Sequence, residues 1–215
     1  MRIKALFGAT AGAAFIAACA TVPPPASPVL AYARGDCASI PDLTTAISLT
    51  SPKEARTHMV STVVSQQTSC LAREARTTPY VIYALPADRA DKTLIVGGVL
   101  EGFRILSPGV TLLDAEGRVT RAFAAGEFLY RGPVYSVQFR PRDTEAYLMV
   151  DVDATRIGTR YDAINVGTNT TTISTGYITS NFTTGTEARS SRTFSWEGTV
   201  LVTVNDSDTE EKPAP

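Results

Sequence analysis

The sequence predicts a mainly β fold, an antiparallel β-sandwich with a short helical element near its N-terminus. From Thr78 onward, short runs rich in β-branched and aromatic residues recur at intervals of about 8–12 residues, with Gly, Pro and Asp between them, as in sandwich domains. Several runs alternate apolar and polar residues, so each strand would turn one face to a core and the other to solvent. No series of helices alternates with these strands, which disfavours a parallel α/β sheet.

The predicted strands follow one another closely along the chain. One pair has the pattern of a hairpin, because Gly117 can take the positive φ that closes a four-residue turn. The pair Gly97-Gly98 interrupts another apolar run and indicates a bend or a bulge. The predicted strands are Tyr80–Leu85, Thr93–Val96, Val99–Leu100, Val110–Leu113, Arg118–Phe123, Val134–Arg140, Leu148–Val152 and Thr193–Val204.

The beginning of the domain carries signals for both helix and strand. Ser51-Pro52-Lys53-Glu54 has the pattern of a capping box with proline at the first helical position, which predicts a short helix or turn continuing toward Val60. The next residues, Ser61-Thr62-Val63-Val64-Ser65, are largely β-branched and favour a strand. We therefore expect a helical element followed by strand pairing.

A threonine-rich segment precedes the last predicted strand. Gly167–Thr186 contains nine threonines and three glycines but few large apolar residues. Such a length without a core pattern is either a flexible loop or a long hairpin, and the extended preference of threonine favours a hairpin around Thr172–Thr183 that protrudes from the sandwich. Its edge would be open to strand addition by a partner, and Tyr161 and Tyr177 are the candidate exposed aromatic residues for partner binding.

The N-terminus has the pattern of a secretory signal peptide. Arg2 and Lys4 precede an uncharged run that is too short to span a bilayer as a helix. The run ends at Ile16-Ala17-Ala18-Cys19, which resembles the lipobox of bacterial lipoproteins. This resemblance implies a diacylglyceryl thioether on Cys19 and an acylated amine, which together anchor the chain to a membrane. A plain signal peptide with a chance cysteine is the alternative.

The residues after the cysteine indicate a location and a stem. Ala20 takes the place of an aspartate, which resembles the sorting pattern for the outer membrane, with the domain facing the periplasm. The prolines that follow favour an extended stem of about 3.1 Å per residue. The predicted division is a signal peptide (1–18), a lipid-anchored proline-rich stem (19–30), a β-sandwich domain (31–205) and a disordered acidic tail (206–215).

The two remaining cysteines, Cys37 and Cys70, form an even pair in an oxidising compartment. A disulfide between them would close a loop of about 34 residues and stabilise the fold by roughly 3–4 kcal/mol. Two buried free thiols are the alternative. No metal site is expected, because two cysteines and a single histidine are too few ligands for zinc.

Few residues are candidates for catalysis. His58 is the only histidine and no Gly-x-Ser-x-Gly elbow accompanies it, so we expect it at the surface or near the early helix. Asp151 and Asp153 share one face of a strand, and Asp143 and Glu145 lie just upstream. Four carboxylates in this pattern suit calcium binding or glycoside hydrolysis, and they equally suit a solvated strand face and loop. We expect no cofactor.

Four groups of strand-and-turn residues stand out, Tyr83–Ala87 with Leu94–Val96, Ile105–Phe123, Phe128–Tyr130 and Gly198–Val204. Together they resemble the maltose operon periplasmic protein family. The resemblance implies an envelope-attached β-rich domain linked to carbohydrate uptake, without a defined catalytic motif. Trp196 shares the parity of the predicted core residues of its strand, although such a ring can also stack on a sugar.

These observations lead to an expectation about function. Without Arg2 and Lys4 the chain has 18 basic and 21 acidic side chains, a net charge of −3, and no basic run, so nucleic acid is not an expected partner. We expect a non-catalytic envelope lipoprotein, an accessory or assembly partner bound to the membrane through the lipid on Cys19 and to an envelope protein. A carbohydrate-binding or carbohydrate-uptake module is the alternative, and an enzyme is a third possibility.

Overall fold

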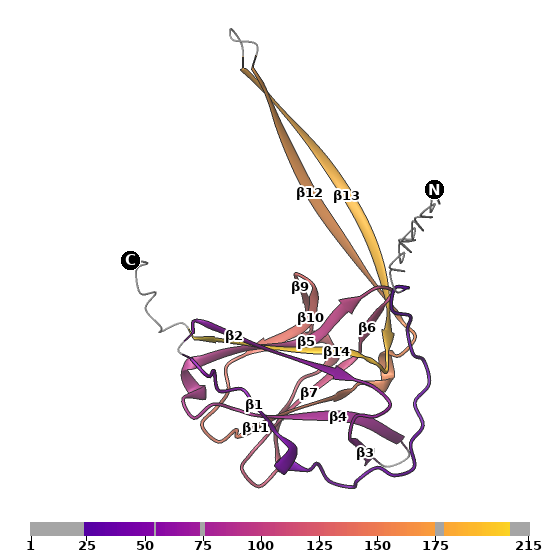
Figure 1. Ribbon diagram of the computed structural model, residues 1–215, viewed down its shortest axis with the longest axis vertical. Helices are drawn as coiled ribbons and strands as arrows, with labels where there is room; N and C mark the ends of the chain where they lie inside the picture. The colour runs from indigo at the N-terminus through magenta and orange to yellow at the C-terminus, as the bar shows by residue number, and fades with distance from the viewer. Residues whose placement is uncertain (1–23, 54, 74–75, 175–178, 207–215) are drawn as a thin grey trace, which may run out of the picture.

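The computed structural model describes residues 24–53, 55–73, 76–174 and 179–206. Strands dominate this part of the chain (Figure 1), which confirms the mainly β fold. No helix in the described ranges is long and apolar enough to cross a membrane. The helical segments there are short 3-10 turns, η1 (Leu43–Thr45), η2 (Arg89–Asp91), η3 (Ala125–Glu127) and η4 (Ala154–Arg156).

The first sheet has the strand order β1-β4-β11-β7-β8, and β3 also pairs with β4. Most neighbours in it are antiparallel, including the predicted hairpin of β7 and β8, in which Gly117 has a φ of 81°. Its strands are β1 (Ile47–Ser48), β3 (Cys70–Arg73), β4 (Arg76–Ala84), β7 (Pro108–Leu113), β8 (Val119–Ala122) and β11 (Tyr147–Val152).

The second sheet has the order β12-β13-β6-β5-β10-β9, with β14 lying against β5 and β2 against β14. Its two longest strands, β12 and β13, continue far beyond the rest of the sheet (Figure 1). Its strands are β2 (Thr57–Val64), β5 (Lys92–Glu101), β6 (Arg104–Leu106), β9 (Leu129–Arg131), β10 (Val134–Phe139), β12 (Arg160–Ser174), β13 (Thr179–Ser195) and β14 (Gly198–Asp206).

Both sheets are mixed, so the expectation of purely antiparallel pairing was wrong. β1 lies parallel to β4, and β6 lies parallel to β13. The members of each parallel pair are far apart in sequence, as they must be, because no tight turn can join parallel strands. Alternation of apolar and polar residues locates a strand but contains no information about the direction of a distant partner.

The main core draws side chains from both sheets. Alternate residues of each strand point to it, so β4 contributes Val81 and Tyr83 while β14 contributes Val200 and Val202. Each fully buried side chain of this size contributes about 1.5–3 kcal/mol relative to exposure. The other buried members of the cluster include Leu94, Val96, Ile105, Leu106, Val110, Leu112, Val137, Phe139, Leu148, Val150, Phe194 and Trp196.

A smaller apolar cluster covers the opposite face of the first sheet. Tyr80 and Ile82 of β4 and Met149 of β11 point to this side. The N-terminal segment lies over them, because Leu43 of η1 packs against the cluster and the Asp42 backbone N–H donates to the Tyr80 hydroxyl at 2.9 Å. The first sheet is therefore covered on both faces.

The short helix predicted from Ser51 does not form in the described residues around it. The Ser51 hydroxyl donates to the Lys53 carbonyl in a local turn, and Glu54 lies outside the described residues. β2 begins at Thr57, three residues after Glu54, and pairs with β14 over its whole length. Its side chains alternate between exposed and more buried positions, as the β-branched composition favours. The segment therefore forms a strand, because β14 provides its hydrogen-bonding partner and alternate side chains of β2 are buried.

Two other predicted strands differ from the structure in detail. Gly97 and Gly98 cause no bulge, and β5 runs continuously opposite β10. They permit close packing instead, since a Cβ on Gly97 would lie 2.1 Å from the Tyr135 carbonyl oxygen. The predicted strand Thr193–Val204 is divided, because β13 ends at Ser195 and Trp196-Glu197 separates it from β14.

The N-terminal residues that are described lie against the domain. The Ala26 carbonyl accepts from the Phe103 N–H at 3.0 Å, and the Val29 carbonyl accepts from the Trp196 N–H at 2.9 Å. These contacts fall within the range assigned to the stem, residues 19–30. Residues 1–23, Cys19 included, and tail residues 207–215 lie outside the described residues.

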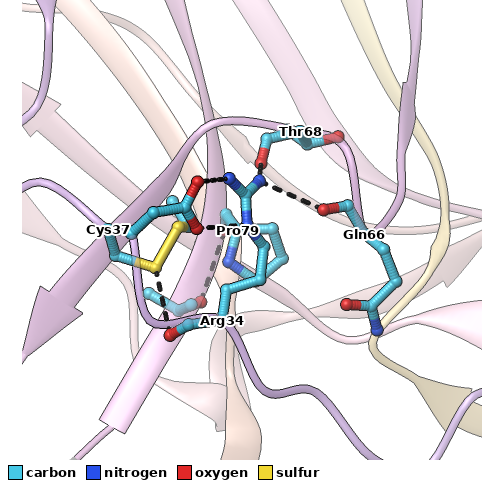
Figure 2. The surroundings of a disulfide bond; sticks show 8 residues. Arg34, Cys37, Gln66, Thr68 and Pro79 are labelled. Carbon is cyan, nitrogen blue, oxygen red and sulfur yellow. Dashed lines mark hydrogen bonds and ion pairs between the residues drawn. A yellow bond between two sulfur atoms is a disulfide. The ribbon is translucent and has the colours of Figure 1, made fainter.

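Cys37 and Cys70 form the predicted disulfide (Figure 2), which connects the N-terminal segment to the start of β3. The backbone joins the same elements, because the Ala38 N–H donates to the Cys70 carbonyl at 3.0 Å and the Ala72 N–H donates to the Ala38 carbonyl at 2.8 Å. The covalent bond and the two hydrogen bonds thus hold the segment in one register on β3.

Arg34 reinforces this junction (Figure 2). Its Nη1 donates to the carbonyls of Gln66 and Thr68, at 3.1 and 3.0 Å, in the turn between β2 and β3. Its Nε donates to Asp36 Oδ1 at 2.9 Å. The hydrogen bond from Arg34 lowers the pKa of the Asp36 carboxyl below its usual value. The Arg34 guanidinium therefore ties the N-terminal segment to the turn between β2 and β3.

Candidate functional site

The first candidate site is the long hairpin of β12 and β13, called the ribbon here and defined by the pairs from Arg160 with Thr193 to Ser174 with Thr179. It projects away from the two sheets (Figure 1). At about 3.4 Å per residue, a strand of this length extends about 50 Å. The predicted protruding hairpin around Thr172–Thr183 is therefore present, and it is far longer than that range.

The ribbon has open edges for most of its length. Among the described strands, β12 pairs with β13 alone, and β13 meets β6 only at Thr193–Ser195. Backbone N–H and C=O groups along such an edge can pair with another strand. Thr170, Thr171 and Thr172 are exposed, and successive residues face opposite sides of a strand, so neither face is covered at this level.

The base of the ribbon rests on an aromatic cluster. The Tyr161 ring centroid lies 5.0 Å from that of Tyr135, 6.1 Å from that of Tyr130 and 6.2 Å from that of Phe194. Each such pair contributes about 0.5–1.5 kcal/mol beyond its buried area. Burial raises the pKa of the Tyr161 hydroxyl above its usual value, and Tyr135 and Tyr130 act in the same direction. These contacts attach the ribbon firmly to the body.

Arg156, in η4 just before β12, organises the cluster. Its guanidinium carbon lies 5.2 Å from the ring centroids of Phe128 and Tyr135 and 5.5 Å from that of Phe194. Its Nη1 donates to the Tyr135 hydroxyl at 2.7 Å, and its Nε lies 3.2 Å from Asp153 Oδ2. A cation against several ring faces is favourable. No local sequence pattern marks Arg156, because its partners come from distant strands.

The two tyrosines proposed to bind a partner therefore differ in position. Tyr161 is half-buried at the base of the ribbon. Tyr177 lies outside the described residues, in the segment 175–178. The structure does not bring the two together among the residues that it describes, and their role in partner binding stays a prediction.

The second candidate site is a cleft in the body, beside the hairpin of β3 and β4. A cavity of about 790 Å³ and one of about 580 Å³ lie side by side here, and Arg76, Thr77 and Trp196 contribute to the lining of both. Trp196 is 9% exposed and its ring stacks on Tyr32 with centroids 5.3 Å apart. The larger cavity is also lined by Arg73, Thr78, Gly109, Asp151, Asp153 and Thr155.

Asp151 is the acid of the cleft whose pKa is raised by its surroundings. It pairs across the strands with Gly109, and a Cβ on that glycine would lie 2.2 Å from Asp151 Oδ1. Its side chain is 16% exposed, and Oδ2 lies 3.6 Å from Arg73 Nη2. Burial raises the pKa of Asp151 to about 6, because the loss of solvation outweighs the attraction of Arg73.

Asp153 has a structural role in the same cleft. Its Oδ1 accepts from the Thr155 N–H at 3.0 Å and from the Thr155 hydroxyl at 2.6 Å, which caps η4. Its Oδ2 pairs with Arg156. The Asp153 carboxylate is thus already engaged in fixing the turn that leads into the ribbon. Asp151 is not part of this turn, so it is the acid of the cleft that is better placed to bind a ligand.

The other two acids of the predicted group lie elsewhere. Glu145 is fully buried, where its Oε2 accepts from Arg121 Nη2 at 2.9 Å and from the Arg142 N–H at 2.7 Å. Asp143 precedes it in an exposed turn. The four carboxylates therefore do not form one site. Asp143 and Glu145 come before β11, whereas Asp151 and Asp153 lie at its other end.

The described residues offer no open metal site. Their one group of three potential ligands with close donor atoms is Asp36, Cys37 and Cys70, and both sulfurs are in the disulfide. His58 lies half-buried on β2, opposite Val204, and it lines a cavity with Ser51 and Lys53, where the predicted helix does not form. In the cleft, guanidinium, carboxyl and hydroxyl groups can bind a polar ligand, and a carboxyl that titrates near pH 6 can hold a proton there.

No known protein family, curated protein or solved structure matches this chain.

Proposed function

We propose that the chain is a non-catalytic lipoprotein of the bacterial envelope, and that it binds its protein partner through the ribbon. The observation that carries this proposal is a pair of long strands that project from the body with open backbone edges. A two-stranded ribbon buries little and is marginal by itself, so its length is not explained by the stability of the body. Strand addition at an open edge is a common mode of partner binding.

The proposed arrangement has a rigid body at the base of the ribbon. The proposed fold of the body is a sandwich of the two mixed sheets, because one apolar cluster draws side chains from both. The aromatic cluster and Arg156 hold the ribbon at a defined place on it. The lipid on Cys19 then keeps the whole domain at the outer membrane, facing the periplasm.

Shortening the ribbon tests the proposal. Gly167 pairs with Thr186, so replacing residues 168–185 with Asn-Gly leaves a two-residue turn that closes a shorter hairpin. Crosslinking in native envelopes should then lose the partners that the full chain captures. The matched control inserts Asn-Gly for Ala115-Glu116 in the turn between β7 and β8 and should leave those partners unchanged. An unchanged set of partners after ribbon shortening would contradict the proposal.

The membrane anchor has its own test. Mass spectrometry of the chain purified from its native envelope should find acyl chains on Cys19 and no residues before it. Cys19→Ser should release the chain from the membrane fraction, whereas Cys37→Ser should not. Unmodified Cys19 in the native host would remove this part of the proposal.

Carbohydrate binding is a second candidate function, favoured by the cleft. Arg76 and Asp151 provide polar groups beside Trp196, and Trp196 is the only tryptophan of the chain. Its fluorescence therefore reports on the cleft, and titration with maltodextrins should shift it if a sugar binds there. Arg76→Gln should weaken that shift, and a flat titration would count against this candidate.

A further inference from the structure

The open edges of the ribbon lack the residues that usually protect an exposed strand. Natural edge strands typically carry lysine, proline or a bulge that hinders pairing with another chain. From Ala163 to Thr186 the sequence contains no charged residue, no histidine and no proline. The register of β12 with β13 also runs without interruption from Arg160 to Ser174. The edge is therefore open to strand pairing along its length.

The composition of this edge favours a partner strand of the same kind. An uncharged edge offers no ion pairs by which it would select a charged peptide. Strands of high β-propensity, low charge and no proline are the ones that pair with identical copies, and ladders of like polar side chains add to that pairing. The ribbon has this composition, being rich in Thr and Asn. A second copy of the chain supplies the matching strand.

The two edges are not equivalent. The outer edge of β13 is occupied by β6 at the base of the ribbon. Among the described strands, β12 has no neighbour other than β13, so its outer edge is open from Arg160 to Ser174. A contact between two copies of β12 uses the same surface on both and closes as a twofold dimer.

We propose that the ribbon pairs with the ribbon of a second copy, β12 against β12 and antiparallel. This inference rests on the proposed function and names the partner of that same surface. The product is a continuous four-stranded sheet, in which the backbone groups along the outer edge of each β12 gain hydrogen-bonding partners. Antiparallel pairing places the two bodies at opposite ends of the shared sheet, so they need no contact with each other.

Two differently tagged full chains, expressed together and purified from the envelope through one tag, test this pairing. The second tag should co-purify. Thr170→Lys with Thr171→Lys puts a positive charge on each face of β12, and a lysine on an edge strand hinders its pairing with another chain. Co-purification should fall severalfold. Thr170→Val with Thr171→Val should retain it, as should Ser61→Lys with Val119→Lys, which adds the same charge to exposed strands of the body.

A cysteine scan measures the direction of pairing. Single cysteines placed in turn from residue 163 to residue 174 should give disulfide-linked dimers, with one maximum at the residue nearest the twofold axis. A cysteine at the exposed Ser61 of β2 should give none. Absence of crosslinks at every ribbon position would overturn the β12 pairing.

The remaining outcomes separate this inference from the proposed function. If the lysine variant co-purifies as well as the wild type, or if wild-type copies do not co-purify, self-pairing is overturned. If ribbon shortening then still removes a different envelope protein, the proposed function stands and only the identity of the partner changes. If shortening alters no partner of any kind, the proposed function itself fails.

Discussion

The body and the ribbon are held together by different forces. In the body, side chains such as Leu148 and Val202 are fully buried in one apolar cluster, and a disulfide ties the N-terminal segment to β3. In the ribbon, backbone hydrogen bonds join β12 and β13 beyond the aromatic base, and Thr170 to Thr172 are exposed. The comparison shows that buried apolar area stabilises the body, whereas backbone pairing defines the ribbon.

The largest expected effect is on the core. Leu148→Ala removes a side chain with no exposure from the main apolar cluster and should lower the free energy of unfolding by about 2–5 kcal/mol. Urea denaturation followed by tryptophan fluorescence measures this, since Trp196 belongs to the same cluster. Leu129→Ala, at an exposed position on β9, is the control and should cost far less. Equal losses would mean that burial does not stabilise the body.

Removing the disulfide should have the next largest effect. Cys37→Ala with Cys70→Ala frees a loop in the unfolded chain and should lower stability by roughly 3–4 kcal/mol. Thermal unfolding of the oxidised wild type and of the double variant gives the value, and a reducing agent should abolish the difference between them. Ribbon crosslinking should be unchanged in the folded variant, because the disulfide lies in the body.

Asp151 should make the body less stable as the pH rises. Its folded pKa of about 6 exceeds the unfolded value near 3.8, so the folded state binds the proton more tightly. The stability contributed by the protonated carboxyl is fully present below pH 3.8 and is lost as the pH rises through 6. Asp151→Asn should therefore match the wild type near pH 4 and be more stable at pH 7, by at most about 3 kcal/mol.

Urea titrations at pH 4 and pH 7 measure this difference. Asp153→Asn is the matched control, since it weakens the η4 cap and the pair with Arg156 and should destabilise the fold at neutral pH. If Asp151→Asn were less stable than the wild type at pH 7, Asp151 would instead be a favourable charge paired with Arg73.

The smallest expected effect is in the ribbon. Thr171→Ala changes an exposed residue that touches no core and should alter the unfolding free energy of the body by less than about 0.5 kcal/mol. Hydrogen exchange of the β12 amides, measured in dilute and concentrated protein, sharpens the comparison. Protection should rise with concentration if copies pair, whereas exchange of β14 amides in the core should not change.

Much of the fold was predictable from residue patterns. The runs around Tyr80–Leu85 and Val134–Arg140 are strands, Gly117 closes its hairpin, and the cysteine pair forms its disulfide. The predictions that were wrong concern segments where two local patterns conflict or where no local pattern exists. The capping pattern at Ser51 predicted a helix, but the following residues pair with β14. Because β14 is distant in sequence, no local pattern indicates this pairing. Asp151 and Trp196 are both candidate site residues in the sequence, yet no local sequence pattern places them in one cleft.

By itself, the sequence determined that this chain is a β protein with a cysteine pair and a long uncharged threonine-rich segment. These are consequences of composition and of the two-residue period of a strand, which act locally. Only the tertiary structure decided that the sheets are mixed, that Arg156 sits among rings at the base of the ribbon and that Asp151 titrates near pH 6. Strand partners and burial depend on contacts between residues far apart in the chain, and those contacts exist only in the folded state.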